Sequence, residues 1–302
     1  MLSFREITLT DRSWIQKALK QSDFMGCEYS FANNLAWHRA ADSRIARFED
    51  FYLICAFATE DGAPHFSFPS GTGDYRRVIG AMAEYAAAAN QPLIITGLTD
   101  RTMPVLEQAF PGMFSLHNDR DSADYLYLTE EFTALSGKKY HKKRNHISQF
   151  SKYGAVFSEM TPADFDECIA FAAHSYNEKD GYTDTSSVIE QYAIHTFFEH
   201  FAELELCGGV LRVDGELVAF SIGEPICSNV FGVHIEKANT RYHGAYPAMA
   251  QQFAAHFAKG YTYLNREEDL GVPGLRKSKL SYYPAILLEK WTAVCDTPEQ
   301  LF

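Results

Sequence analysis

Several features that define other classes of protein are missing from this chain of 302 residues. No apolar stretch approaches the ~20 residues that a membrane-spanning helix needs. The first residues, MLSFREITLTDRSW, lack the apolar core and cleavage site of a secretory signal. There is no Pro-, Gly- or Ser-rich spacer, no low-complexity segment and no short-period repeat. These absences predict a folded protein without an integral membrane segment.

Cysteine and histidine occur, but without the spacings of metal sites. The six cysteines stand singly with no CxxC pair, and the eleven histidines contain no HExxH. Most of the cysteines have apolar neighbours, which favours buried, reduced thiols in a cytoplasmic protein, with peripheral membrane association left open. We therefore expect no metal site.

Positive charge is scarce, with 27 Lys and Arg residues against 39 Asp and Glu residues and a formal net charge of -12. Long-range attraction to nucleic acid is therefore not expected, and any basic patch must be local. The composition, 46% apolar and 14% aromatic, excludes a disordered chain. The length suggests about two domains of ~150 residues.

One segment, Leu135 to Phe150, reverses this charge with five cations within seven residues. The cations are Lys138, Lys139, Lys142, Lys143 and Arg144. A solvated helix face is the ordinary explanation of such a run. Apolar residues at helical spacing nevertheless tether the segment to a core, and a fixed basic helix is a good anion site. Arg144 would then bind a phosphate or carboxylate in bidentate fashion, and Lys143 would act as a point charge.

A second segment, Asn265 to Pro284, concentrates acids, glycines and cations between two apolar runs. Its order indicates a strand, a tight polar turn, a basic helix start and another strand. The acids are Glu267, Glu268 and Asp269, the glycines are Gly271 and Gly274, and the cations are Arg276, Lys277 and Lys279. Acids at a strand end that face cations in the next turn form a plausible reaction centre, and glycines let the backbone approach a ligand closely.

Hydrophobic periodicity divides the chain into two halves with a similar order of elements. We predict an α/β (α+β) protein of two lobes with mixed sheets: residues 1–130, a basic linker helix over 131–153, and residues 154–302. The predicted strands are Phe4–Leu9, 51–59, 65–70, 92–98, 123–129, 155–161, a hairpin over 206–226, 228–238, 261–267 and 285–294. The predicted helices are 11–20, 74–89, 103–110, 162–176, 187–201 and one that follows the loop at 239–246.

This order of elements resembles the GNAT acyltransferase fold. In that fold a loop of the form Gln/Arg-x-x-Gly-x-Gly/Ala binds the pyrophosphate of coenzyme A at a helix N-terminus. The corresponding stretch here runs from Arg241 through Gly244 and Ala245 to Tyr246. The arginine and the glycine match the pattern, whereas Tyr246 departs from it and crowds the cradle. A plain loop with a turn at Gly244 is the alternative.

The segments KKYHKKRNHISQF and NREEDLGVPGLRKSKLSYYP sharpen this resemblance. Both are similar to a bacterial family of unknown function that resembles the C-terminal domain of phosphatidylglycerol lysyltransferases. The resemblance covers nearly the whole chain and implies two tandem GNAT-like lobes, as in the Fem aminoacyltransferases. It implies transfer of an aminoacyl group from aminoacyl-tRNA to a hydroxyl or amine. The positions that it carries over are Asp269, Gly274, Arg276 and Lys279, and Lys143, Arg144 and Asn145.

The chemistry of acyl transfer gives these residues candidate roles. A carboxylate, Glu267 or Asp269, would take the proton of the nucleophile. A fixed cation, Lys279 or Arg276, would stabilise the oxyanion. The structural alternatives are that Asp269 caps the turn that begins at Leu270, and that both cations lie on a solvated helix face. We expect Lys279 to be exposed and to contribute little to stability.

Three further features are weaker. Tyr176 and Tyr182 flank a polar loop that covers the acceptor in GNAT-like folds, although most such tyrosines are amphipathic surface residues. His234 lies in a strand-like run, where a satisfied core histidine is expected more often than a base. Ser221 lacks the sequence pattern of a nucleophile elbow, which argues against a covalent hydrolase.

The sequence therefore predicts an acyl- or aminoacyl-transferase. Its activated donor would be aminoacyl-tRNA or acyl-CoA, neither of them permanently bound, and its acceptor an amine or hydroxyl of a small molecule or lipid. A coenzyme-A-dependent N-acyltransferase is one alternative. The alternative from another class is an inert GNAT-like ligand-binding protein, because a fold does not fix a function.

Overall fold

The computed structural model describes the backbone of residues 2–177 and 185–302, and the side chains of these residues except 175–177 and 185–187. The chain forms two compact units whose sequences interleave. Unit 1 comprises residues 1–124, 268–272 and 287–302, and unit 2 comprises residues 125–267 and 273–286. We predicted contiguous ranges instead; the interleaving arises because the chain after residue 267 enters unit 1 twice.

Unit 1 is a mixed sheet with helices packed against it. Its strand order is β1-β2-β3-β5-β12-β6, and β4 pairs with β2. β1 pairs antiparallel with β2, whereas β3 pairs parallel with β5. The strands are β1 (Ser43–Phe48), β2 (Phe51–Ala56), β3 (His65–Ser67), β4 (Ser70–Gly71), β5 (Leu93–Leu98), β6 (Ser115–Leu128) and β12 (Ile286–Cys295). The helices are α1 (Arg12–Ser22), α2 (Phe31–Trp37), α3 (Tyr75–Ala88) and α4 (Met103–Ala109).

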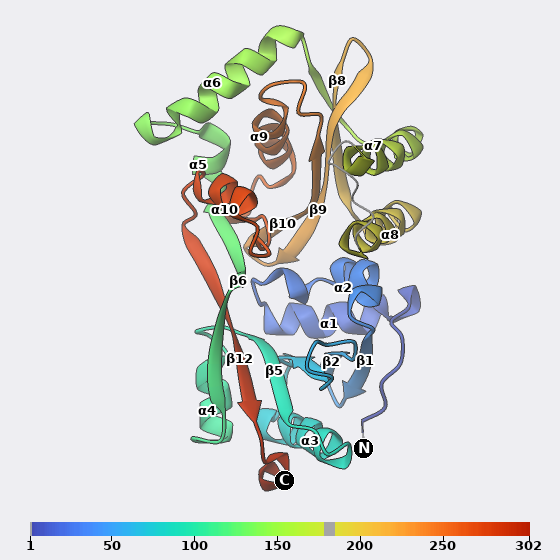
Figure 1. Cartoon of the computed structure of the whole chain (residues 1–302), viewed down its shortest axis with the longest axis vertical. Coiled ribbons are helices and arrows are strands. Elements are labelled where there is room, and N and C mark those ends of the chain that lie inside the picture. The colour runs from blue at the N-terminus through green and yellow to red at the C-terminus, as the bar shows by residue number, and fades with distance from the viewer. Residues whose placement is uncertain (1, 178–184) are drawn as a thin grey trace. The chain divides into compact units, whose positions relative to one another are not determined.

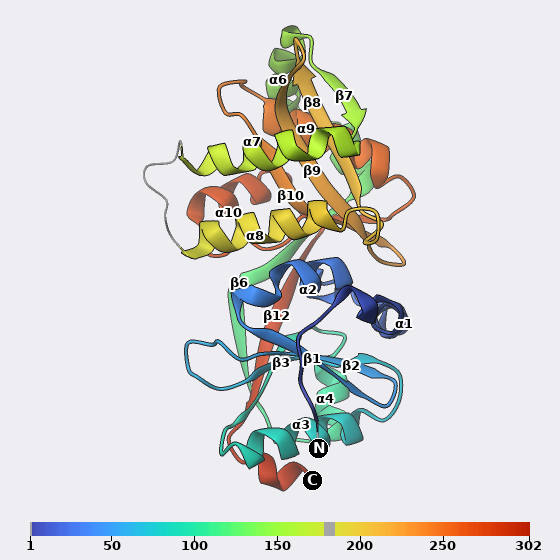
Figure 2. The same ribbon diagram turned by 90° about the vertical axis from the view of Figure 1, so that its right-hand side faces the viewer.

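Unit 2 is built on a sheet of order β6-β11-β10-β9-β8-β7. In Figures 1 and 2, α7 and α8 lie side by side on one face of β8 and β9, and α9 lies on the other face. Its strands are β7 (Val156–Glu159), β8 (Cys207–Val213), β9 (Glu216–Cys227), β10 (Val230–Ala238) and β11 (Tyr263–Asn265). Its helices are α5 (Thr129–Ala134), α6 (His141–Phe150), α7 (Phe165–Asn177), α8 (Thr185–Glu199), α9 (Ala245–Phe257) and α10 (Pro273–Leu280).

Local sequence explains most of these elements. The β8–β9 hairpin turns at Asp214 and Gly215, which both have positive φ as tight hairpin turns require. Asp74 caps α3 through its carboxylate, which accepts a hydrogen bond from the Arg76 N–H. Buried aromatic and aliphatic side chains, such as Phe220 on β9 and Phe253 on α9, fill the core of unit 2. Burial of each such side chain contributes roughly 1.5–3 kcal/mol.

The predicted fold class is confirmed, because both units carry mixed sheets with flanking helices. The predicted strand Phe4–Leu9 is wrong, since the segment makes only an isolated bridge between Arg5 and Ile45. The alternation of apolar residues is the same in a segment with one isolated bridge as in a paired strand, so the sequence pattern does not distinguish them. In the described part of the chain, none of the helices combines the length and the apolarity that crossing a bilayer requires.

Candidate active site

The site of interest in unit 2 lies where two parallel strands separate. β10 and β11 pair in parallel over three residues only, ending at Gly232 and Asn265. β10 continues to Ala238, whereas the chain after β11 turns away at Glu267, whose φ is +56°. The Asn265 side-chain oxygen accepts the Glu267 N–H at 2.7 Å and holds this left-handed turn. The two strands therefore separate at this point, and the side chains described next lie around the opening between them.

His234 on β10 contacts two carboxylates, Glu267 across this opening and Glu224 on the neighbouring strand β9. Its Nδ1 lies 2.8 Å from Glu267 Oε1, and its Nε2 lies 3.3 Å from Glu224 Oε1. The imidazole is fully buried and stacks on Phe197 of α8 at 5.6 Å between ring centroids. The interpretation as a satisfied core histidine is confirmed. A β-bulge between Val233 and Ile235 re-aims the side chains of β10 at this point.

Arg266 forms the second bridge across the opening. Its Nη2 lies 2.7 Å from Glu236 Oε1 on β10, and both side chains are nearly buried. The guanidinium also lies 5.2 Å from the centre of the Tyr282 ring and 5.5 Å from that of Phe132. Those two rings stack at 4.9 Å. We call these two stacked rings, Phe132 and Tyr282, the aromatic floor. They fix the position of Arg266, because guanidinium planes pack on ring faces.

Lys279 lies in the last turn of α10 and is buried, so the expectation of an exposed lysine is wrong. Its ammonium donates to the backbone carbonyls of Arg266 at 2.5 Å and Glu267 at 3.1 Å. The sequence pattern of α10 by itself puts Lys279 on a polar, solvent-facing side of the helix, and it does not show what packs against that side. Its carbonyl contacts instead tie α10 to the turn that carries Glu267.

Lys143 on α6 reaches the same aromatic floor. Its ammonium lies 3.6 Å from the centre of the Tyr282 ring, a close cation–π contact. Burial, together with repulsion from Arg266, lowers the pKa of Lys143 to about 8, although Glu236 opposes the shift. The basic segment thus contributes one cation to the opening.

The other residues predicted on α6 lie elsewhere. Nη1 of Arg144 donates to the carbonyls of Leu135 and Gly137, at the end of α5. The Asn145 amide contacts His141 Nε2 at 3.3 Å along the exposed side of the helix. The structure therefore brings Lys143 to the strand opening, whereas Arg144 is used in a capping contact.

The glycine loop that resembles a pyrophosphate cradle packs closely against α6. Gly244 is the N-cap of α9 with φ of +93°, and a Cβ there would collide with the His146 carbonyl of α6. His146 Nδ1 also lies 2.8 Å from His243 Nε2. Ala245 is buried at the start of α9, while Arg241 is exposed. The close backbone approach that Gly244 permits is made by α6.

Asp269 belongs to unit 1 and is fully buried. Its Oδ2 lies 3.3 Å from Arg120 Nη1, and its Oδ1 accepts the Gly271 N–H at 3.0 Å. These contacts match the structural alternative, in which Asp269 stabilises the turn after Leu270. Arg276 is half-buried on α10, and Gly274 lies in the first turn of the same helix.

The side chains of the two predicted lid residues lie outside the described part of the chain. Tyr176 lies within α7, but its side chain is outside the described residues. Tyr182 falls within 178–184, which also lie outside the described residues.

Unit 1 contains a buried charge cluster that sequence reasoning missed. Lys290 Nζ lies 2.8 Å from Asp124, 2.8 Å from Glu268 and 2.9 Å from Glu28. Cys27 Sγ is 3.6 Å from the same ammonium. Burial opposes the charge, but the carboxylates outweigh it and hold the pKa of Lys290 well above its ordinary value. Cys27, Asp124 and Glu268 offer metal-like ligand atoms, and the ammonium of Lys290 lies among them.

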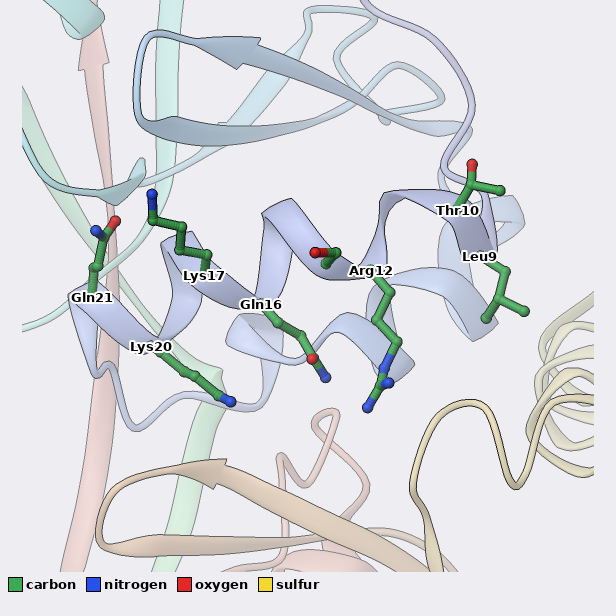
Figure 3. Close-up of a pocket in the computed structure, with 8 residues that line it drawn as sticks. Leu9, Thr10, Arg12, Gln16, Lys17, Lys20 and Gln21 are labelled. Atoms are coloured by element: carbon green, nitrogen blue, oxygen red, sulfur yellow. The ribbon is translucent and has the colours of Figure 1, made fainter.

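A hollow of about 660 Å³ runs along α1 in unit 1. Its lining side chains, several of them basic, come from α1 and the turn before it (Figure 3). The lining residues are Leu9, Thr10, Arg12, Ser13, Gln16, Lys17, Lys20 and Gln21. None of the predicted site residues is among them, so this hollow does not add to the candidate site.

The functional groups that the sequence did not single out are Glu224, Glu236, Arg266 and Tyr282. One signal was available: the run FGVHIEKA places His234 and Glu236 inside an otherwise buried strand. Buried ionisable residues are rare unless paired. Their partners follow only from strand pairing, which the sequence does not display.

The His234 bridge should make stability depend on pH. Burial lowers the pKa of His234, but its bonds to Glu224 and Glu267 outweigh burial and raise the pKa to about 9. Because this exceeds the value of ~6.5 for an unfolded chain, the stabilisation is complete below pH 6.5 and is lost as pH rises through 9. We expect the free energy of unfolding to fall by about 3 kcal/mol across that interval. Urea denaturation of the wild type and of His234→Gln at pH 6, 7.5 and 9 measures this. Equal pH slopes for the two proteins would contradict the assignment.

Comparison with known proteins identifies the family. The model of the family described as phosphatidylglycerol lysyltransferase, C-terminal, matches residues 19–294. A solved protein of unknown function from Bacteroides thetaiotaomicron is 37% identical, with a TM-score of 0.91, over 98% of this chain and all of that chain. An uncharacterized protein of Mycoplasmoides gallisepticum is 22% identical over 56% of this chain, and the match spans 55% of that protein's length.

Two more distant structures share the fold. The L-PGS structure from Bacillus licheniformis has a TM-score of 0.63 and 18% identity, over 88% of this chain and 89% of that chain. FemX has a TM-score of 0.62 and 9% identity, over 99% of each chain. The predicted architecture of two GNAT-like lobes and the predicted resemblance are thereby confirmed. The chain belongs to the phosphatidylglycerol lysyltransferase C-terminal family.

Proposed function

We propose that this protein transfers an aminoacyl group from an aminoacyl-tRNA to an amine or hydroxyl acceptor, at the opening between β10 and β11. The observation that carries the proposal is the position of Glu267. A half-buried carboxylate stands at the end of β11, oriented by a buried histidine and followed by a carbonyl that Lys279 anchors. Family membership and the fold shared with FemX and L-PGS support the reaction class.

In this mechanism Glu267 accepts the proton of the attacking nucleophile as the nucleophile bonds to the carbonyl carbon of the aminoacyl group. When the ester bond to the tRNA ribose breaks, Glu267 returns that proton to the leaving ribose oxygen. A general base must lie within hydrogen-bond reach of that proton, and His234 restrains the carboxylate so that this reach is maintained. Asp269 is the weaker candidate, because it is fully buried and paired with Arg120. Its predicted role as base is therefore not carried into the proposal.

The developing oxyanion is stabilised by fixed positive charge near the same turn. Arg266 and Lys143 supply that charge, because both lie against Tyr282 and, among the described residues, a single carboxylate, Glu236, pairs with Arg266. Lys279 acts as a positioning residue, since its ammonium is engaged by two carbonyls of the Glu267 turn. Arg276 remains a candidate for contact with the donor from α10.

The packing of the glycine loop bears on the identity of the acyl-donor substrate. In this chain α6 occupies the backbone at Gly244, where the GNAT pattern holds a pyrophosphate. The loop therefore favours a donor other than acyl-CoA. The same observation favours the alternative function, a GNAT-like protein that binds a ligand without catalysis.

A lipid is the acceptor that best fits the surface of unit 2. Leu275, Leu280 and Tyr283 are 38%, 45% and 49% exposed on and just after α10, which also carries Lys277. Exposed apolar side chains beside cations suit the surface of an anionic membrane. The description of the family, phosphatidylglycerol lysyltransferase, C-terminal, is consistent with such an acceptor.

A donor assay separates these functions. Purified protein is incubated with phosphatidylglycerol vesicles and with each of a set of radiolabelled aminoacyl-tRNAs, or with radiolabelled acetyl-CoA. We expect label in the lipid fraction from an aminoacyl-tRNA and none from acetyl-CoA. Label from acetyl-CoA would contradict the assignment of the loop. Absence of transfer from every donor, with binding of a donor retained, would establish the non-catalytic alternative.

A further inference from the structure

One hydrogen-bond donor of Arg266, beside the Tyr282 and Phe132 rings, is unsatisfied among the described residues. Its Nη1 is buried and has no hydrogen-bond partner in the part of the chain that the structure describes, although Nη2 of the same group pairs with Glu236. An unsatisfied buried donor is unfavourable, and more so when it belongs to a charged group. Native proteins keep few such donors, and an acceptor on a bound ion or molecule is one explanation of those that remain.

A second cation lies beside it. Lys143 Nζ and the Arg266 guanidinium lie 3.6 Å and 5.2 Å from the centre of the Tyr282 ring. The contact that the structure gives the Lys143 ammonium is this ring, and the repulsion from Arg266 helps to lower its pKa. Two like charges held together with one carboxylate between them leave an excess of positive charge. A bound anion would offset that excess.

We propose that Lys143 and Arg266, on the face of Tyr282, form a binding site for a phosphate group. Arginine offers the planar donor pair that matches phosphate oxygens, and lysine adds a point charge. Glu236 fixes one edge of the guanidinium and leaves the other edge to the ligand.

The different burial of Lys143 and Arg266 indicates the side from which a phosphate enters the site. The side chains of Arg266 and Glu236 are 13% and 11% exposed, whereas Lys143 is half-buried at the end of a flexible four-carbon stem. Lys143 is thus the movable member of the site. A ligand phosphate meets the Lys143 ammonium first and then reaches the Arg266 Nη1 behind it.

The site deepens the proposed function, on which its biological meaning rests. Both proposed substrates carry phosphodiesters, the tRNA in its terminal nucleotides and the lipid in its headgroup. The chemistry that the site recognises is common to both, and the source is decided by experiment. Binding is measured without turnover, so the two proposals can fail separately.

Isothermal titration calorimetry at pH 7 tests the site with three probes: inorganic phosphate, adenosine 5′-monophosphate and dihexanoyl phosphatidylglycerol below its micellar concentration. We expect Lys143→Gln to raise the Kd of whichever probe binds by about tenfold or more, as loss of a charged hydrogen bond implies. Arg266→Lys keeps a cation for Glu236 but removes the orphan donor, and it should weaken binding similarly. Lys143→Arg should remain within about threefold of the wild type.

Lys142→Gln is the matched control, because Lys142 is the exposed neighbour on the same helix and the substitution removes the same charge. It should bind like the wild type. Preference for the nucleotide or for the lipid assigns the source of the phosphate, and equal binding assigns a general phosphate site.

Two results would overturn the site: no probe binds the wild type, or Lys143→Gln and a folded Arg266→Lys bind as the wild type does. If those variants bind normally while the wild type transfers an aminoacyl group, the subsite is wrong and the transferase stands. If the variants bind weakly while the wild type reacts with no donor, the subsite stands and the transferase is wrong.

Discussion

Glu267→Gln is expected to lower the rate of aminoacyl transfer about 10²–10⁴-fold, the usual contribution of a general base. The amide keeps an oxygen that accepts from His234 Nδ1, at the position of the present 2.8 Å contact. The substitution therefore removes basicity and preserves most of the geometry. Single-turnover transfer from labelled aminoacyl-tRNA measures the effect.

The fold of this variant should survive. His234 keeps Glu224 as a partner, and the Glu267 turn keeps its backbone bonds to Lys279 and Asn265. We expect the free energy of unfolding to fall by at most about 1.5–3 kcal/mol, the value of one charged hydrogen bond, because the amide retains a neutral bond in its place. Glu203→Gln, an exposed carboxylate in unit 2, is the control and should change neither quantity. A rate above one third of the wild type would remove Glu267 from the mechanism.

Lys290→Met is expected to cost about 3–5 kcal/mol in the free energy of unfolding, the largest stability effect predicted for this chain. The ammonium is 6% exposed and stands against Asp124, Glu28 and Glu268. Its removal leaves these carboxylates close together without a cation, and Asp124 is fully buried. Urea denaturation at pH 7 measures the loss.

The cost should depend on pH. Without Lys290 the carboxylates resist ionisation, so their folded-state pKa values rise and the variant regains stability as pH falls. Lys290→Met combined with Asp124→Asn should recover part of the loss, because one unpaired charge is removed. Lys17→Met on the exposed side of α1 is the control. A loss below about 1 kcal/mol for Lys290→Met would show that this cluster does not hold unit 1 together.

Gly244 shows how a motif can match a pattern and serve another purpose. The sequence resembles a pyrophosphate loop, and the glycine does permit a close backbone approach. The group that approaches is the carbonyl of His146, from a helix about 100 positions earlier in the chain. A single sequence cannot distinguish the two, because both demand the absence of a Cβ.

The basic segment shows a related limit. Its sequence predicts a tethered helix and an anion site, and the structure contains the helix, α6. Of the neighbours Lys143 and Arg144, the structure brings the first to Tyr282 and uses the second at the end of α5. Adjacent helical residues point about 100° apart, so which of them meets the site depends on how the helix docks.

The sequence by itself determined the fold class, most helices and strands, and the family. Those depend on apolar periodicity, turn residues and motifs that lie close together in the chain. Tertiary structure alone decided that Glu267 is held by His234, that Lys279 is buried and that Arg266 meets Glu236. It also decided that Lys290 gathers three carboxylates. The physical reason is that charged groups are buried only with partners, and the partners come from distant strands whose pairing creates the low-dielectric environment.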